Sequence, residues 1–106
     1  MKRVLVKMHD IDAGVLIREN PTNYIFQYDP VYNGPAISLT MPIKDRPYSF
    51  NGFPPFFDGL LPEGIQLDGL LKIYKIDRDD YFTQLVTIGA DLVGAVTVLP
   101  LNNDDE

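Results

Sequence analysis

The residues best able to do chemistry in this chain are few, and they begin with its single histidine. His9 is followed by Asp10 and Asp12, and an imidazole beside carboxylates suits a metal site or a general base with an orienting acid. The same residue types are typical of the polar tip of a hairpin turn. The turn is the favoured interpretation. A small enzyme or metal-binding protein using His9 stays as a remote alternative.

A second group, Asp77, Asp79 and Asp80, has the charge for a Ca²⁺ site. It lacks the loop glycine and closing glutamate of an EF-hand, so we interpret these residues as acidic charge at a helix N-terminus. The glycines stand singly, without a GxxxxGK[ST] or GxGxxG pattern that would cradle phosphates. We therefore expect no catalytic residue, no metal and no cofactor, and predict a protein that is not an enzyme.

Composition and charge narrow the class of protein further. The 106 residues contain no cysteine, which excludes disulfides, thiolate zinc sites and a cysteine nucleophile. Nine basic against fifteen acidic residues give a formal net charge of -6, which repels a nucleic-acid backbone. No apolar run is long enough for a signal peptide or a membrane span. We expect a genuine start at Met1, a cytoplasmic location and no direct nucleic-acid partner.

The elements that must position these residues form one α+β domain over residues 1–101, followed by a short acidic tail at 102–106. Alternating apolar residues between turn signals predict strands at 3–8, 14–19, 24–28 and 36–41, and a last strand at 93–99. We expect a small antiparallel sheet, a meander that is partly barrel-like. Two to three short helices should lie between the fourth and the last strand.

Helical periodicity replaces the strand pattern in the second half. Leu67, Leu70, Leu71 and Tyr74 follow the spacing of an amphipathic helix, in which Gly69 costs about 1 kcal/mol relative to alanine. Asp77 and Asp80 resemble the capped start of a second helix. Its expected buried stripe consists of Tyr81 or Phe82, Leu85 and Ile88, and Gly89 is expected to stop it.

The segment between the strands and these helices, residues 51–64, is the most unusual stretch of the chain. It combines phenylalanines, leucines, prolines and glycines without a clean period. Phe56, Phe57, Leu60 and Leu61 are expected to form one helical turn that plugs the sheet. The residues from Leu61 to Ile65 cannot all face inward from a turn bounded by proline and glycine, so some apolar surface should protrude as an anchor for another protein. For Ile65, anchor and core are equally favoured.

Two stretches resemble a known family. The run FFDGLLPEG at residues 56–64 is similar to the FFxxLLPE segment of the N-terminal domain of HipA-like serine/threonine kinases. The run GADLVGAV at residues 89–96 resembles that domain's Gly-x-Asp-x-x-Gly-Ala-Val stretch, although Ala90 departs from the Gly or Arg expected there. Residues 28–30 and 36–42 match its earlier strands, so the resemblance covers nearly the whole chain.

The resemblance covers a domain that lies outside the kinase core, and it therefore implies a function other than catalysis. In the family this domain precedes the core that supplies the ATP site, the catalytic aspartate and the metal ligands. In the tripartite HipBST arrangement, a small HipS protein corresponds to the domain, a HipT kinase is the toxin and a HipB protein binds DNA. The resemblance therefore implies an antitoxin that binds and inhibits a HipT-type kinase, with a HipB-type protein in the same complex.

Specific residues follow from this interpretation. The expected kinase-binding segment consists of Leu60, Leu61, Pro62, Glu63, Gly64 and Ile65. Phe56, Phe57, Gly89, Asp91 and Gly94 are expected to be structural. Gly89 should end a helix, Gly94 should permit a close approach at the last strand, and Asp91 should tie a turn through backbone hydrogen bonds. The main alternative is a non-inhibitory N-terminal scaffold or regulatory domain of a HipA-like kinase, against which the acidic ending weighs mildly. A third possibility is that the acidic surface mimics DNA toward a repressor, but no run of regularly spaced carboxylates supports it.

Overall fold

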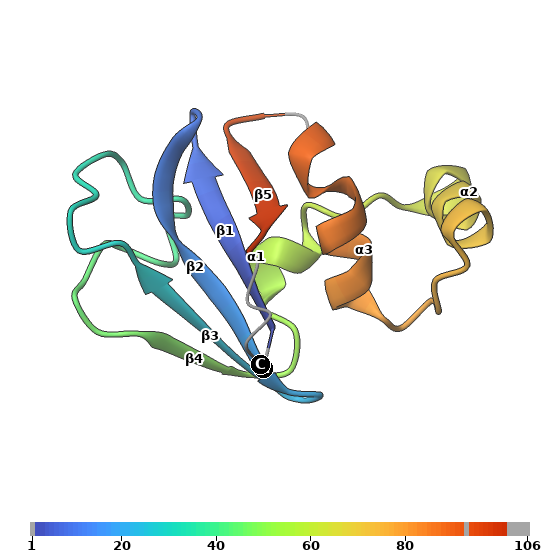
Figure 1. Ribbon diagram of the computed structural model, residues 1–106, viewed down its shortest axis with the longest axis horizontal. Coiled ribbons are helices and arrows are strands. Elements are labelled where there is room, and N and C mark those ends of the chain that lie inside the picture. Colours follow the sequence, from blue (N-terminus) through green and yellow to red (C-terminus); the bar gives the residue numbers. More distant parts are fainter. Residues whose placement is uncertain (1, 93, 102–106) are drawn as a thin grey trace.

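The computed structural model describes residues 2–92 and 94–101. It contains strands β1 (Lys2–Met8), β2 (Ile11–Asn20), β3 (Asn23–Tyr28), β4 (Tyr48–Asn51) and β5 (Val96–Pro100). Helices α1 (Pro55–Asp58), α2 (Gly64–Tyr74) and α3 (Tyr81–Ile88) and the 3₁₀ turn η1 (Gly89–Asp91) lie between β4 and β5. The α+β class and the placement of the helices before the last strand are as predicted (Figure 1). The expected tail, residues 102–106, lies outside the described residues.

The five strands form one antiparallel sheet in the order β4-β3-β2-β1-β5. The first four make a meander, and β5 returns beside β1 after the helices. The sheet stays open, with β4 and β5 at its edges, so the partly barrel-like form is not realised. The predicted last strand begins three residues later than expected, at Val96, and position 93 is not among the described residues.

The alternation of the strands places one sheet face against α1 and α3. Val4, Val6, Leu16, Phe26 and Val98 are fully buried on that face. The Phe26 ring lies 6.0 Å from Phe57 of α1, and Tyr24 lies 6.1 Å from Phe82 of α3. Burying one such side chain contributes about 1.5–3 kcal/mol. The core therefore lies between the sheet and the two helices, and it fixes the position of the segment that follows α1.

The hairpin between β1 and β2 turns at His9 and Asp10, as the favoured interpretation predicted. Their φ angles of 52° and 66° are the left-handed pair that a tight two-residue hairpin needs. The His9 backbone N–H donates to the Ala95 carbonyl at 2.8 Å, which ties the turn to the segment before β5. Lys7 pairs with Asp12 at 3.2 Å.

The predicted strand at 36–41 is wrong. Ile37 and Met41 are buried, but Leu39 between them is fully exposed at the tip of a turn, where the Met41 N–H donates to the Ser38 carbonyl at 3.1 Å. The backbone of this loop is bound instead by Tyr28, whose hydroxyl donates to the Met41 carbonyl at 2.5 Å and accepts from the Ile37 N–H at 3.0 Å. The true fourth strand is β4.

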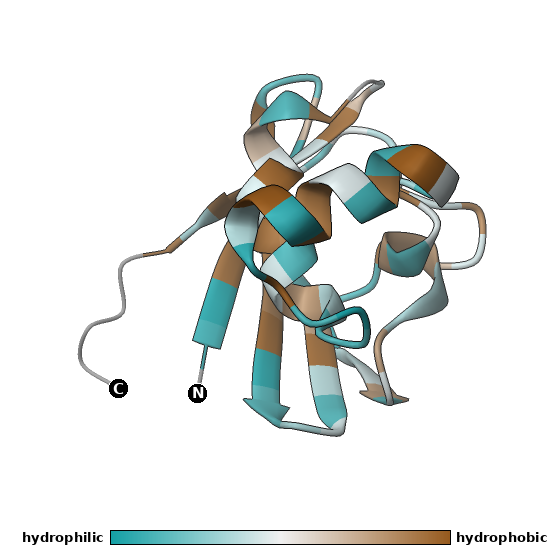
Figure 2. Ribbon diagram, turned by 90° about the vertical axis from the view of Figure 1, so that its right-hand side faces the viewer, coloured by the Kyte–Doolittle hydropathy of each residue, from teal (hydrophilic) through white to brown (hydrophobic). Residues whose placement is uncertain are grey.

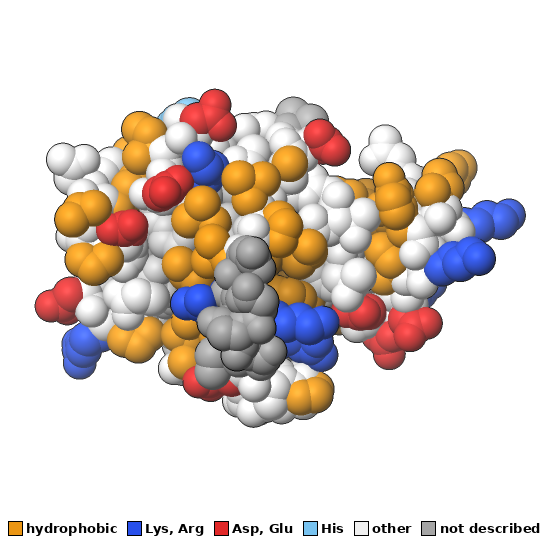
Figure 3. All heavy atoms as spheres, in the orientation of Figure 1, with side chains coloured by type: hydrophobic (Ala, Val, Ile, Leu, Met, Phe, Trp, Pro, Cys, Tyr) orange, Lys and Arg blue, Asp and Glu red, His pale blue; other side chains and the backbone are white. Residues whose placement is uncertain are grey.

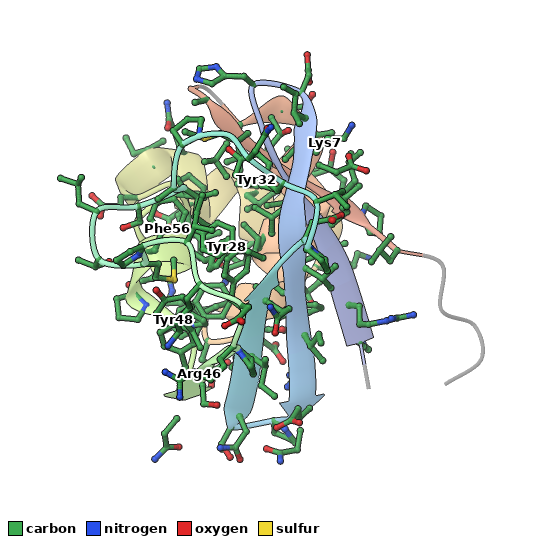
Figure 4. All side chains as sticks on the ribbon, turned by 90° about the vertical axis from the view of Figure 1, so that its left-hand side faces the viewer. Lys7, Tyr28, Tyr32, Arg46, Tyr48 and Phe56 are labelled. Carbon is green, nitrogen blue, oxygen red and sulfur yellow. The ribbon has the colours of Figure 1, made fainter. Side chains whose placement is uncertain are left out.

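Aromatic rings support this long loop between β3 and β4. Tyr28 and Tyr32 stack with ring centres 6.2 Å apart, and Figure 4 labels both on the side of the molecule where the loop runs. Tyr32 donates to the Pro35 carbonyl at 2.5 Å, and the Tyr48 hydroxyl donates to the Pro42 carbonyl. Side-chain hydroxyls therefore satisfy carbonyls that a sheet would otherwise bind.

Candidate protein-interaction surface

Residues 56–61 form a chain of consecutive tight turns. Pro54 accepts hydrogen bonds from Phe57 and Asp58, both at 3.1 Å, and the Leu60 N–H donates to the Phe57 carbonyl at the same distance. Phe57 is fully buried, while Phe56 is half-buried with its ring 5.1 Å from that of Phe57. The expectation of a helical turn that plugs the sheet is met at Phe57.

The next two leucines have unequal surroundings. Leu60 is half-buried, and Leu61 is 9% exposed and belongs to the hydrophobic core. The Leu61 N–H donates to the Asp58 carbonyl at 3.1 Å, which turns the side chain back toward the core. Leu61 therefore anchors the segment to its own domain, and little of its side chain is left for the kinase contact expected of it.

After Leu61 the chain leaves the core. Pro62 is half-buried, Glu63 is exposed in extended conformation as the N-cap of α2, and Gly64 opens the helix with a left-handed φ of 63°. Ile65, the next residue, is 87% exposed. Ile65 is therefore not part of the core, and its role as an anchor for a partner stays a prediction.

Helix α2 stands away from the rest of the molecule. Figure 1 shows it at one end, joined to the sheet and α3 only by connecting segments. Of its four expected inward residues, only Leu70 is buried. Leu67 and Leu71 are half-buried, and Tyr74 is 60% exposed. The helix is present as predicted, but its own domain covers little of it.

Both ends of α2 are nevertheless anchored. Leu61 secures the connection before it. After it, the buried Gln84 side chain of α3 donates to the carbonyls of Asp77 at 3.2 Å and Arg78 at 3.0 Å. Arg78 pairs in turn with Asp68 of α2 at 2.6 Å, although both side chains are largely exposed. The segments before and after α2 are thus fixed to the rest of the domain, while the helix itself lies outside the core.

The second motif begins where α3 ends. Gly89 is the C-cap of that helix, as predicted, but the close approach expected at Gly94 occurs at Gly89 instead. Gly89 has a right-handed φ of −56°, but a side chain there would overlap the Val98 carbonyl and Cβ in β5. Gly94 has a φ of 118°, and a Cβ there would meet nothing within 4 Å. Gly89 therefore provides the close approach and Gly94 the special backbone angle. Asp91 is exposed at the end of η1, and its turn-tying role stays a prediction.

A groove of about 320 Å³ runs between the two motifs. Its lining residues come from the segment after α1, the first turn of α2, and the end of α3 with η1: Leu60, Pro62, Gln66, Ile88, Asp91 and Leu92. Leu60 and Pro62 from the expected kinase-binding segment therefore share one surface with Asp91 of the second motif. No local pattern predicted that these residues share a surface, since they are about 30 positions apart.

The remaining chemical candidates have structural roles. The Asp80 carboxylate caps α3 by accepting from the Thr83 N–H at 3.2 Å and from its hydroxyl at 2.8 Å. Tyr81 is 41% exposed and Phe82 is buried, so Phe82 belongs to the inward stripe of α3. Within residues 2–92 and 94–101, no three His, Asp or Glu side chains are grouped to hold a metal ion. The same residues contain no helix long and apolar enough to cross a membrane.

Sequence reasoning missed the outward apolar residues of α2 beyond Ile65. Ile73 is 73% exposed, and Figure 2, which faces the α2 side, shows apolar and polar segments alternating along the helices. Ile73 stands eight residues after Ile65, on nearly the same helical face. That spacing was readable beforehand as a second apolar stripe, opposite the one assigned to the core.

Comparisons with known proteins agree on one family. A profile of the HipA N-terminal domain matches residues 4–99. An uncharacterized protein of Haemophilus influenzae is 34% identical over 83 residues, which covers 78% of each chain. The putative kinase Y4dM of Sinorhizobium fredii is 36% identical over 94% of this chain, which spans 27% of that protein's length. A solved N-terminal domain of HipA toxin matches with a TM-score of 0.76 and 28% identity, over 97% of this chain and 95% of that one.

Proposed function

This chain belongs to the HipA N-terminal domain family, and we propose that it acts as an antitoxin subunit that binds and inhibits a HipA-like serine/threonine kinase toxin of the HipT type. The observation that carries the proposal is the 87% exposure of Ile65, directly after a connector whose Leu61 is fixed in the core. An aliphatic side chain this exposed, on a segment this firmly attached, is typical of an anchor for another protein.

Inhibition follows if the anchor favours one arrangement of the kinase over another. A subunit restrains an enzyme only to the extent that it binds the inactive arrangement more tightly than the active one. The segment from Leu60 to Ile65, with the groove beside it, supplies apolar contact area at a fixed position on the domain. Bound to the kinase lobe, it would hold active-site elements away from their productive positions.

A DNA-binding protein of the HipB type is the second partner in the proposed complex. The net charge of -6 disfavours direct binding of this chain to a phosphate backbone, so DNA binding falls to another subunit. The acidic surface of this chain can speed its encounter with a basic surface of a partner protein. The proposed complex thus contains a kinase, a DNA-binding protein and this chain.

One observation favours a second candidate function. The match to the putative kinase Y4dM covers about a quarter of that protein, so a domain of this kind also occurs inside a longer chain. There the domain would be a scaffold or regulatory part in cis, without an inhibitory role of its own. The two candidates differ in whether adding this chain changes the activity of a separate kinase.

The test is co-purification of this chain with a HipA-like kinase from the same genome, followed by an autophosphorylation assay with and without the chain. We expect a stable complex with suppressed kinase activity. A stable complex with full activity would overturn inhibition and leave the scaffold role. Absence of a complex would overturn the kinase as partner.

A further inference from the structure

Gly69, in the middle of α2, has no structural explanation within this chain. Its φ is not left-handed, and a Cβ built at this position meets no atom of another element within 4 Å. Glycine is nevertheless one of the least favourable residues in a helix interior. Neither backbone geometry nor packing against the described residues of the domain requires it, and a partner that approaches the helix closely is one physical requirement that would.

The neighbours of Gly69 on the helix surface indicate what that requirement is. Residues four apart lie above one another on a helix, so Ile65, Gly69 and Ile73 form one stripe. The two isoleucines are 87% and 73% exposed. A glycine between two projecting aliphatic side chains leaves a notch in an apolar surface.

We infer that the stripe of Ile65, Gly69 and Ile73 is a notch that receives a projecting apolar side chain of the kinase. This inference rests on the proposed function and extends its contact from the connector to the outer face of α2. Close approach to a helix backbone through a small residue, with large residues on both sides, is the geometry of knobs-into-holes packing.

Charge identifies the chemistry of the partner surface. Lys72 precedes Ile73 beside the stripe and is exposed, as is Lys75 at the end of α2. Figure 3 shows hydrophobic and basic side chains together at the α2 end of the molecule. Among the described residues, no carboxylate pairs with Lys72, because Asp68, four residues earlier on the same flank, is bound to Arg78. The complementary partner therefore presents an apolar knob flanked by a carboxylate opposite Lys72.

A second copy of this chain is a poorer occupant. An 11-residue helix is about 16 Å long, and two such helices side by side bury well under the roughly 1,000 Å² that a stable specific interface needs. Two copies would also each bring a net charge of -6. A kinase that contacts both the groove and α2 would cover more area than a second copy of the helix.

The experiment compares two substitutions at Gly69 that differ in size and little in helix propensity, Gly69→Ala and Gly69→Leu. Both are expected to melt at or above the temperature of the wild-type chain, because a side chain there meets open space. Leucine fills the notch and alanine largely leaves it open. We expect the Kd for the kinase to be at least about tenfold higher for Gly69→Leu than for Gly69→Ala, a loss of hot-spot size.

A second pair tests the flank of the notch. Ile73→Asp should raise the Kd at least about tenfold. The control is Leu39→Asp, which places the same charge on an even more exposed aliphatic residue in the loop before β4, and it should bind like the wild type. Equal Kd values within either pair would overturn the notch while leaving the proposed function standing, and so would a lowered melting temperature of Gly69→Leu. Failure of the wild-type chain to bind the kinase would overturn both.

Discussion

Leu61 and Ile65 stand four residues apart in one connector but have opposite surroundings. Leu61 is 9% exposed within the core, and Ile65 is 87% exposed. We expect Ile65→Asp to keep the wild-type free energy of unfolding and to raise the Kd for the kinase about tenfold or more. Leu61→Asp should instead lower the free energy of unfolding by about 3 kcal/mol or more, because it buries a charge.

Urea denaturation of each free variant and calorimetric titration with the kinase separate the two effects. The wild-type chain measured on the same day is the control. If Ile65→Asp unfolded at the same reduced urea concentration as Leu61→Asp, Ile65 would have a structural role that its exposure does not indicate. Unchanged affinity of Ile65→Asp would remove it from the interface.

Tyr28 holds the long loop between β3 and β4 through one hydroxyl group. That hydroxyl donates to the Met41 carbonyl and accepts from the Ile37 N–H. Tyr28→Phe keeps the ring and leaves both buried backbone groups without this partner, so the free energy of unfolding should fall by about 1–3 kcal/mol. Urea denaturation of the variant checks this, and a change below about 0.5 kcal/mol would contradict it.

The same side chain gives the fold a dependence on alkaline pH. Burial is the main cause that raises the pKa of Tyr28 above its ordinary value of 10.0, opposed by the hydrogen bond from Ile37. The folded chain therefore holds the phenol proton more tightly than the unfolded chain. This contribution to stability is complete below pH 10 and is lost as the pH rises from 10 through the folded pKa.

We expect the free energy of unfolding of the wild-type chain to decline between pH 10 and 11 more steeply than that of Tyr28→Phe. Tyr24, whose pKa burial also raises, titrates in both proteins and accounts for part of the remaining decline. Urea denaturation at half-unit pH steps measures the two slopes. Parallel curves would show that the Tyr28 hydroxyl does not supply this dependence.

At the scale of elements, local pattern predicted what depends on local chemistry. Alternation, turn residues and capping each depend on only a few neighbouring residues. They predicted strands β1 to β3, the β1–β2 turn, α2 and the Asp80 cap of α3. The strand at 36–41 failed because its alternating apolar residues also fit a turn that buries Ile37 and Met41. The turn is stabilised over a strand by hydrogen bonds to Tyr28, which lies nine residues or more away in sequence.

The candidate surface was likewise predictable only where it depends on neighbouring residues. Proline and glycine predicted that part of the segment from Leu61 to Ile65 would be exposed, because no compact turn buries every residue, but they left anchor and core equally favoured for Ile65. Leu61 was assigned both to the buried turn and to the protruding segment, and its burial depends on a hydrogen bond to Asp58 and on the position of the sheet. The outward face of α2 was missed because apolar periodicity is ordinarily assigned to a helix's own core, although the spacing of Ile65 and Ile73 also fits a second stripe.

Gly89 and Gly94 offer a test of how η1 docks on β5. Gly89→Ala should lower the free energy of unfolding by about 2 kcal/mol or more, because the new methyl group would overlap the Val98 backbone in a packed region. Gly94→Ala should cost about 1–2 kcal/mol through its positive φ alone. The two variants are compared by thermal and urea denaturation. A larger loss for Gly94→Ala would reverse the assignment of their roles.

At the scale of the whole molecule, the chain divides into a compact body and one outlying helix. The sheet, α1 and α3 share a continuous core, while Leu70, the buried residue of α2, is not part of it. Local stability follows the apolar contacts that must be broken for a segment to open. The two parts of the molecule are therefore expected to open with different free energies.

Hydrogen exchange measures this difference directly. In the free chain, amides of the central strands β1 and β2 should exchange only through global unfolding, near the full 5–15 kcal/mol typical of domains. Amides of α2 should exchange through a local opening of no more than about 2 kcal/mol, since little of the helix is covered and Gly69 weakens it. Binding of the kinase should raise the protection of α2 far more than that of β1, because only α2 gains contacts that its own domain does not provide. If the α2 amides were already as slow as those of β1 in the free chain, the helix would be part of the cooperative core. Its outward isoleucines would then be displayed on a rigid surface instead of an element that a partner completes.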